Sequence, residues 1–215
     1  MDLSEYLRPT RFIDSDNRKI KEKAEELTSG KDIYEKARSL FYFVRDRIKY
    51  TVYVPKLKEE ENIASRILEK GKGYCVQKAV LLAALSRASG IPARLRFADI
   101  INWRLPEHIL KLRKGDRLFV FHGYSELYIN GRWVKVAAVF NLDLCIKHAI
   151  IPVEFDGKND ALLPEKDFFG NPYIEYIKDR GSYSDLPLDD IIRERKRLQK
   201  VADFYEEMIK GGQRL

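Results

Sequence analysis

Cys75 is the residue whose type and surroundings best suit covalent chemistry in this 215-residue chain. It follows Gly71-Lys72-Gly73, whose glycines let a substrate approach the main chain. The next residues, VQKAVLLAALSRAS, are apolar around most of a helix that should end at Gly90. A thiol in the first turn of such a helix experiences the positive end of the helix dipole, which favours the nucleophilic thiolate. We therefore expect Cys75 to attack a carbonyl carbon, with its own main-chain N–H as one oxyanion donor.

His122 is the candidate base for this nucleophile, because a cysteine without a partner is more often a small buried residue. It lies in a predicted strand, residues 118–129, which is followed by Asn130-Gly131 and a second strand pattern, residues 132–140. The Asn-Gly pair favours a two-residue type I′ turn, so the two strands should form a hairpin. Considered without Cys75, His122 would better fit a strand histidine satisfied by a neighbour.

The turn also predicts which residues face His122 across the hairpin. Its register places His122 opposite Val139, with Ala137 and Asn141 as diagonal neighbours on the same face. The same register pairs Glu126 with Lys135 and Tyr128 with Trp133, which are favourable cross-strand pairs. A third group that orients the imidazole is therefore expected from the positions beside His122.

Two stretches of the sequence resemble the core of the transglutaminase-like superfamily. They are GKGYCVQKAVLLAALSRASGIPARLRF and HGYSELYINGRWVKV, and the resemblance covers roughly residues 32–141. In this papain-like group, Cys, His and Asp act in that chain order. The resemblance implies an α+β fold, with a helical layer packed on an antiparallel sheet. It also implies that Cys75 is the nucleophile and His122 the general base.

The sequence departs from the family pattern at the third member of the site. The family's Asp usually stands four residues after the tryptophan, and that position is Ala137. A histidine without an orienting partner loses its preferred tautomer and position. Asn141 is the natural substitute by the register argument, since papain-like enzymes use Asn in this role, and Asp143 is a poorer candidate. Tyr74, which adjoins the nucleophile, is the best candidate for a wall of the substrate cleft.

The rest of the chain is predicted to complete a single domain, residues 1–215, around the core at 32–141. A helical lead-in occupies residues 1–31, and loops with an amphipathic helix occupy residues 142–215. Within this plan we expect helices at 15–27, 32–49, 62–70 and 188–209, short strands at 50–54 and 93–98, a loop with a helical turn at 101–116, and loops with at most one short strand at 142–183.

The composition of the chain limits the classes of partner that we expect it to bind. The net charge is +7, but acidic and basic residues are mixed almost everywhere, and the one basic run, Arg193–Lys200, lies inside a helical pattern. No apolar stretch has the ~20 residues of a membrane helix, and the first residues do not match a signal peptide. We expect a cytoplasmic protein with free thiols that binds neither membranes nor nucleic acid.

Metal chemistry is the weaker alternative. Cys145 and His148 have spacing that could supply two ligands, but a structural zinc site needs four and no second pair is present. His108 lies among charged residues and should be solvated. We therefore predict no metal and no cofactor.

Two functions remain open. The first is a cysteine acyltransferase or hydrolase that acts on an amide or peptide bond of a protein or peptide through a thioester, with hydrolysis slightly favoured over transamidation. The second is a catalytically weak or inactive domain that binds a protein or peptide in the same cleft, which Ala137 favours.

Overall fold

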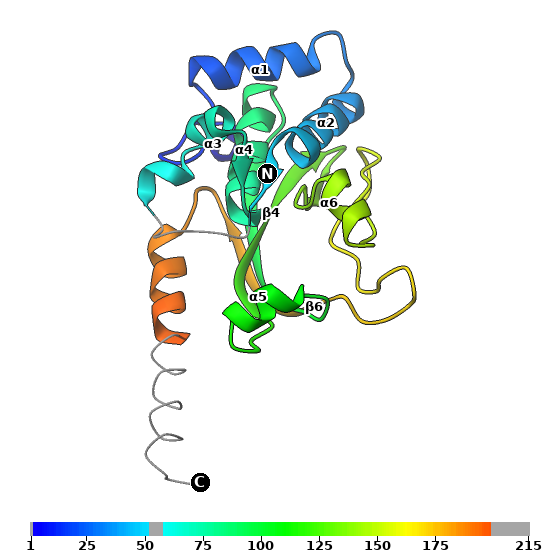
Figure 1. Cartoon of the computed structure of the whole chain (residues 1–215). Helices are drawn as coiled ribbons and strands as arrows, with labels where there is room; N and C mark the ends of the chain where they lie inside the picture. Colours follow the sequence, from blue (N-terminus) through cyan, green and yellow to red (C-terminus); the bar gives the residue numbers. More distant parts are fainter. Residues whose placement is uncertain (1, 52–57, 199–215) are drawn as a thin grey trace, which may run out of the picture.

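The chain folds as a helical layer on a four-stranded antiparallel sheet. The structure is a computed structural model that describes residues 2–51 and 58–198. Buried apolar side chains from Phe12 to Ile191 belong to one continuous core. Figure 1 shows α1 (Arg18–Thr28), α2 (Ile33–Tyr42) and α3 (Ala64–Lys70) gathered around α4 (Cys75–Ala88) at one end of the molecule. The predicted α+β architecture is confirmed.

The N-terminal helices begin close to the predicted places. Asn17, two residues after the predicted helix start, caps α1 through a hydrogen bond from Lys19 N to its side chain. Asp32 caps α2 in a capping box with Glu35, as expected for an Asp-x-x-Glu sequence. The predicted helix 32–49 is shorter, because α2 ends at Tyr42 and passes into a π-helical turn, η2 (Phe43–Arg47). The carbonyls at the end of this turn need partners outside it.

Helix α4 is the central element of the fold, as its apolar circumference predicts. Every residue from Lys78 to Arg87 is buried. Arg87 is accommodated because its guanidinium donates to the carbonyls of Arg8, Ala93 and Ser184. These bonds tie α4 to the N-terminal segment and to the chain that follows the last strand.

The predicted hairpin is confirmed at its turn. The sheet order is β5-β4-β3-β6, and β4 (Leu118–Ile129) joins β5 (Arg132–Val136) through Asn130 and Gly131, which both have positive φ. The pairs Glu126–Lys135 and Tyr128–Trp133 form as predicted. The central strand β3 (Ala93–Asn102) is longer than expected and continues to Asn102. This sheet supports the long side of α4.

The hairpin ladder ends before it reaches His122, which corrects the register argument. The last β4–β5 pair is Ser125–Val136, so β5 is shorter than the predicted 132–140. Beyond it, Ala137 N–H donates to the carbonyl of Ala161, which draws the chain away from β4. His122 pairs instead with Ala98 on β3. The predicted opposition of His122 and Val139 is wrong.

Strand β6 (Ile174–Tyr183) is the largest element that sequence patterns do not reveal. Its sequence, IEYIKDRGSY, lies in a segment predicted to be mostly loops, yet it pairs with β3 over ten residues. Two irregularities in that pairing and several exposed polar side chains weaken the alternation typical of a strand. The C-terminal segment therefore completes the sheet rather than only covering it.

The remaining elements are short. Lys49–Tyr50 (β1) pairs in parallel with Lys72–Gly73 (β2), whereas most of the predicted strand 50–54 lies outside the described residues. The connection between β3 and β4 contains α5 (Glu107–Leu112), and α6 (Leu142–Lys147) follows the hairpin. Residues 4–6 and 59–62 form 3-10 turns. The C-terminal helix is described over residues 188–198, so the rest of its predicted span lies outside the described residues.

Within residues 2–51 and 58–198, no helix has both the length and the apolar character needed to cross a membrane.

Candidate active site

Cys75 is the first residue of α4, as predicted, and its thiol is half-buried. The turn before it is held by Gln77, which accepts a hydrogen bond from Tyr74 N at 3.3 Å and donates to Glu61 O at 2.8 Å. Gly73 is needed in this turn, because a β-carbon there would lie 3.0 Å from Gln77 Cβ. The main chain therefore presents Cys75 at a defined helix start with its N–H unused within the helix.

Strand β4 approaches the start of α4 at Gly123, the residue next to His122. A β-carbon on Gly123 would lie 3.0 Å from the Cα of Val76, so glycine favours this close approach. Val76 follows Cys75 in the chain, and Gly123 follows His122. The contact between Val76 and Gly123 therefore brings together the segments that carry Cys75 and His122. No hydrogen bond joins the Cys75 thiol to the imidazole in the described part of the chain, and His122 Nε2 is buried without a hydrogen-bond partner.

Burial determines the protonation of both groups. It lowers the pKa of His122 to about 4, so the imidazole is neutral at physiological pH. Burial also raises the pKa of the Cys75 thiol, while the main-chain amide of Gly123 and the charge of Arg195 oppose this rise. The expected thiolate is thus not favoured in the free protein, because desolvation exceeds the effect of the helix dipole. The pair consists of a thiol and a neutral imidazole.

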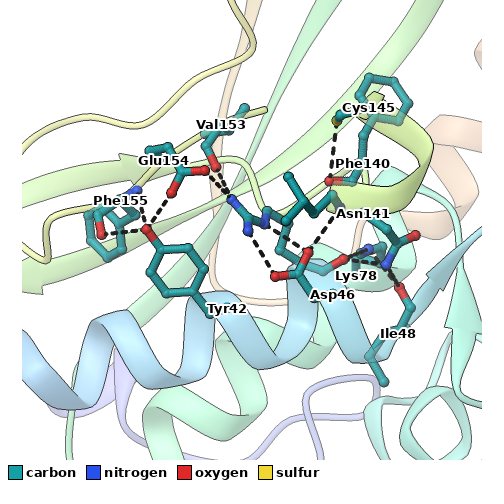
Figure 2. Close-up of polar contacts among 12 residues, drawn as sticks. Tyr42, Asp46, Ile48, Lys78, Phe140, Asn141, Cys145, Val153, Glu154 and Phe155 are labelled. Carbon is teal, nitrogen blue, oxygen red and sulfur yellow. Dashed lines mark hydrogen bonds and ion pairs between the residues drawn. The ribbon is translucent and has the colours of Figure 1, made fainter. Parts of the chain in front are cut away.

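Asn141 does not contact His122. Its side-chain oxygen accepts a hydrogen bond from Tyr50 N at 2.6 Å. Its amide nitrogen donates to Ile48 O at 3.0 Å and to Arg45 O. These bonds use the whole side chain on η2, Ile48 and β1, and Figure 2 shows the bond to Ile48. The prediction that Asn141 faces His122 failed because the hairpin ladder on which it depended ends at Val136.

Tyrosines surround the thiol. Tyr74, the predicted cleft wall, is buried with its hydroxyl unbonded. Tyr50 is drawn to the same place by the β1–β2 pairing, which aligns it with Gly73. The nearby Cys75 adds to the burial that raises the pKa of the Tyr50 hydroxyl. Aromatic side chains therefore lie near Cys75 on the side of the segment before α4.

Tyr176 is a site residue that sequence reasoning missed. Its ring lies 6.1 Å from the ring of His122 in an edge-to-face arrangement, and its hydroxyl accepts a hydrogen bond from Leu163 N at 3.3 Å. The pKa of this hydroxyl is raised by burial and, to a smaller extent, by the charge of Cys75. Tyr176 belongs to β6, and the alternating apolar residues Ile174 and Tyr176 are the only sequence signal that could have pointed to it.

Cys145 and His148 do not form a site together. Cys145 is buried on α6, and burial raises the pKa of its thiol to about 11. His148 is exposed at the end of that helix, and His108 is exposed on α5. Over residues 2–51 and 58–198, no group of three or more His, Cys, Asp and Glu side chains could hold a metal ion. Cys145 has the character of an unreactive core thiol.

Comparisons with known proteins agree with this arrangement at the level of the family. The model of the transglutaminase-like superfamily matches residues 21–138, more than half of the chain. No curated protein matches the chain.

Two solved structures illustrate the fold relationship. One is a Cytophaga hutchinsonii protein provisionally assigned to the cysteine proteases, with 18% identity and a TM-score of 0.49 over 85% of this chain and 55% of that one. The other is the periplasmic domain of TgpA from Pseudomonas aeruginosa, with 20% identity and a TM-score of 0.39 over 56% of this chain and 43% of that one. This chain thus spans about half of the length of these solved chains. On the family match, the chain belongs to the transglutaminase-like superfamily.

Proposed function

We propose that this protein is a cysteine acyltransferase or hydrolase that acts on an amide or peptide bond. The observation that carries the proposal is the contact between Gly123 and Val76, which brings the strand of His122 to the start of the helix that Cys75 opens. Cys75 is partly buried, and the segment before it carries Tyr74, with Tyr50 paired beside Gly73. A protein or peptide is the proposed substrate, and a cytoplasmic location remains a prediction.

The neutral state of both groups indicates general-base catalysis rather than a preformed ion pair. As Cys75 Sγ forms a bond to the carbonyl carbon, His122 takes the thiol proton, and the developing oxyanion accepts from Cys75 N–H. The C–N bond then breaks, and His122 returns the proton to the leaving amine. Water hydrolyses the resulting thioester, or a primary amine attacks it to give a new amide.

Trapping of the thioester tests this proposal. The full chain is incubated with p-nitrophenyl acetate, and the acetylated residue is located by mass spectrometry. We expect one acetyl group on Cys75, no adduct at this position in C75S, and a rate at pH 7 that falls about a hundredfold or more in H122A. C145S is the matched control and should acylate like the wild type. Acylation of Cys75 at an equal rate in wild type and H122A would contradict the proposed role of His122.

A second function, a binding module for proteins or peptides, is favoured by two observations on the candidate base. His122 Nε2 is buried without a hydrogen-bond partner, and the position where the family has its Asp is Ala137. An imidazole that nothing orients is a poor base. If this function is correct, a peptide library presented to the wild type and to C75S will yield ligands that bind equally well and are recovered intact. Cleavage or acyl transfer that depends on Cys75 would exclude it.

A further inference from the structure

Lys78 is a buried cation on the same helix as Cys75, one turn further along. Only 1% of its surface is exposed. Its ammonium donates to the main-chain carbonyls of Arg45 at 2.9 Å and Ile48 at 2.7 Å. A lysine is rarely fully buried unless it is paired, so these bonds require an explanation.

Asn141 donates to the same two carbonyls. Its side-chain nitrogen also donates to Arg45 O and Ile48 O, so each oxygen accepts hydrogen bonds from both Lys78 and Asn141. These oxygens belong to the last turn of η2 and to the residue that follows it. Figure 2 shows Lys78 and Asn141 converging on this segment. Together they satisfy carbonyls that the end of a helical turn leaves unpaired.

The charged groups around Lys78 explain how the cation is tolerated. Asp46, on η2, favours the ammonium form of Lys78, whereas the charge of Arg45 opposes it. Cys145 of α6 favours the ammonium form to a smaller extent. Asp46 also accepts from Leu142 N at 3.0 Å, which attaches the start of α6 to η2. Desolvation remains the largest influence and lowers the pKa of Lys78 to about 7. Burial of this amine costs free energy, so we infer that its hydrogen bonds fix the position of η2 and Ile48.

The fixed segment leads directly to the Cys75 cleft. Asn141 also accepts from Tyr50 N at 2.6 Å, and the Tyr50 ring packs edge-to-face on Phe140, with centroids 4.8 Å apart. Thr51 N donates to Gly73 O at 3.2 Å, within the turn that precedes Cys75. The position of Tyr50 near the thiol therefore depends on Asn141, which shares the acceptors Arg45 O and Ile48 O with Lys78.

We propose that Lys78 and Asn141 are positioning residues for the Cys75 cleft, which act by fixing η2 and thereby holding Tyr50 over the thiol. The inference rests on the proposed function only in treating Cys75 as the reactive group. It gives Asn141 a role in the site different from orienting the imidazole. It also makes the access of substrate to Cys75 dependent on a buried network that no substrate touches.

The test is the rate at which iodoacetamide alkylates Cys75 in the full chain at pH 7.5, followed by peptide mass spectrometry. N141A and K78M should each release Tyr50 and increase the rate by about threefold or more, and Y50A should do the same. The double variant N141A/Y50A should react no faster than Y50A alone, because both changes act through Tyr50. Lys21→Met and Asn159→Ala, at exposed positions, are the matched controls and should leave the rate unchanged.

Cys145 serves as an internal control for unfolding, since it is buried and reacts only if the fold opens. Asn141→Asp keeps the acceptor for Tyr50 N–H but removes both donors to the carbonyls of Arg45 and Ile48, so it should also react faster than the wild type if Asn141 acts by fixing η2. Wild-type rates in both N141A and K78M, or effects that multiply with Y50A, would overturn the proposal. The assay requires no turnover, so its outcome is independent of whether the protein catalyses acyl transfer.

Discussion

The guanidinium carbon of Arg195 lies 5.6 Å from the centre of the Tyr74 ring, one residue before the candidate nucleophile. The two neighbouring arginines of the same helix are paired, Arg193 with Asp190 and Arg197 with Glu194. Within the described residues, no ion pair joins Arg195 to a carboxylate. Its positive charge is therefore directed at the Cys75 cleft, where it favours the thiolate.

Removal of this charge should make the thiol less acidic. In R195Q we expect the pKa of Cys75 to rise and its alkylation by iodoacetamide at pH 8 to slow by about two- to fivefold, the effect of one partly solvated charge. R193Q is the control, because Arg193 is exposed and paired with Asp190. Equal rates in the two variants would show that Arg195 does not act on the thiol.

His122 should remain neutral well below the pH at which an exposed histidine is protonated. NMR of the ring carbons should report a pKa of about 4, because burial penalises the imidazolium. Between pH 6.5 and 4 the unfolded chain binds more protons at this residue than the folded one. The free energy of unfolding should therefore fall with decreasing pH in this range, by at most about 1.4 kcal/mol per pH unit. H122Q should lack this component, and an identical slope in H122Q would contradict the assignment.

The family resemblance puts an aspartate at position 137, so A137D tests whether this position faces His122. In A137D we expect the pKa of His122 to rise above 4 and acylation of Cys75 to accelerate by about tenfold or more, because an oriented imidazole is a better base. A138D places the same charge at the adjacent buried alanine and is the control for nonspecific effects. If A137D folds and changes neither quantity, position 137 does not face the imidazole.

Glu126 should be among the most important charged residues for stability. It is 2% exposed and accepts from Arg94 at 2.6 Å, from Arg96 at 3.0 Å and from Ser182 at 2.8 Å. E126A leaves two partly buried guanidinium groups without this partner, so chemical denaturation should show a loss of about 3 kcal/mol. The exposed i,i+4 pair between Arg18 and Glu22 is the control, and E22A should cost less than about 1 kcal/mol. Similar losses in both variants would contradict this account.

Local sequence signals were sufficient for the elements that carry the nucleophile and the base. The apolar circumference of α4 and the Asn130-Gly131 turn each reflect interactions within one short segment, and both predictions are confirmed. The place of Cys75 at the helix start and of His122 on the strand follows from them. Their surroundings do not, because the burial that keeps both groups neutral comes from distant segments.

Long-range contacts account for what the sequence did not reveal. Strand β6 is irregular and polar on its outer face, and its pairing with β3 joins segments about 80 residues apart. Asn141 was assigned to His122 by extending a hairpin register beyond the point where Ala137 leaves β4. Lys78 is a lone lysine in an apolar helical pattern, and only the fold brings Arg45 O and Ile48 O to it. The correct role of each residue depends on partners that no local pattern identifies.

The most direct test of the central claim, that His122 serves Cys75 as a base, is the pH dependence of single-turnover acylation by p-nitrophenyl acetate. With a neutral imidazole and a thiol of raised pKa, the wild-type rate should be flat from pH 5 to 8. In H122A only the free thiolate can react, so the rate should be about a thousandfold lower at pH 6 and rise tenfold per pH unit. A wild-type rate that rises in parallel with that of H122A would contradict the claim.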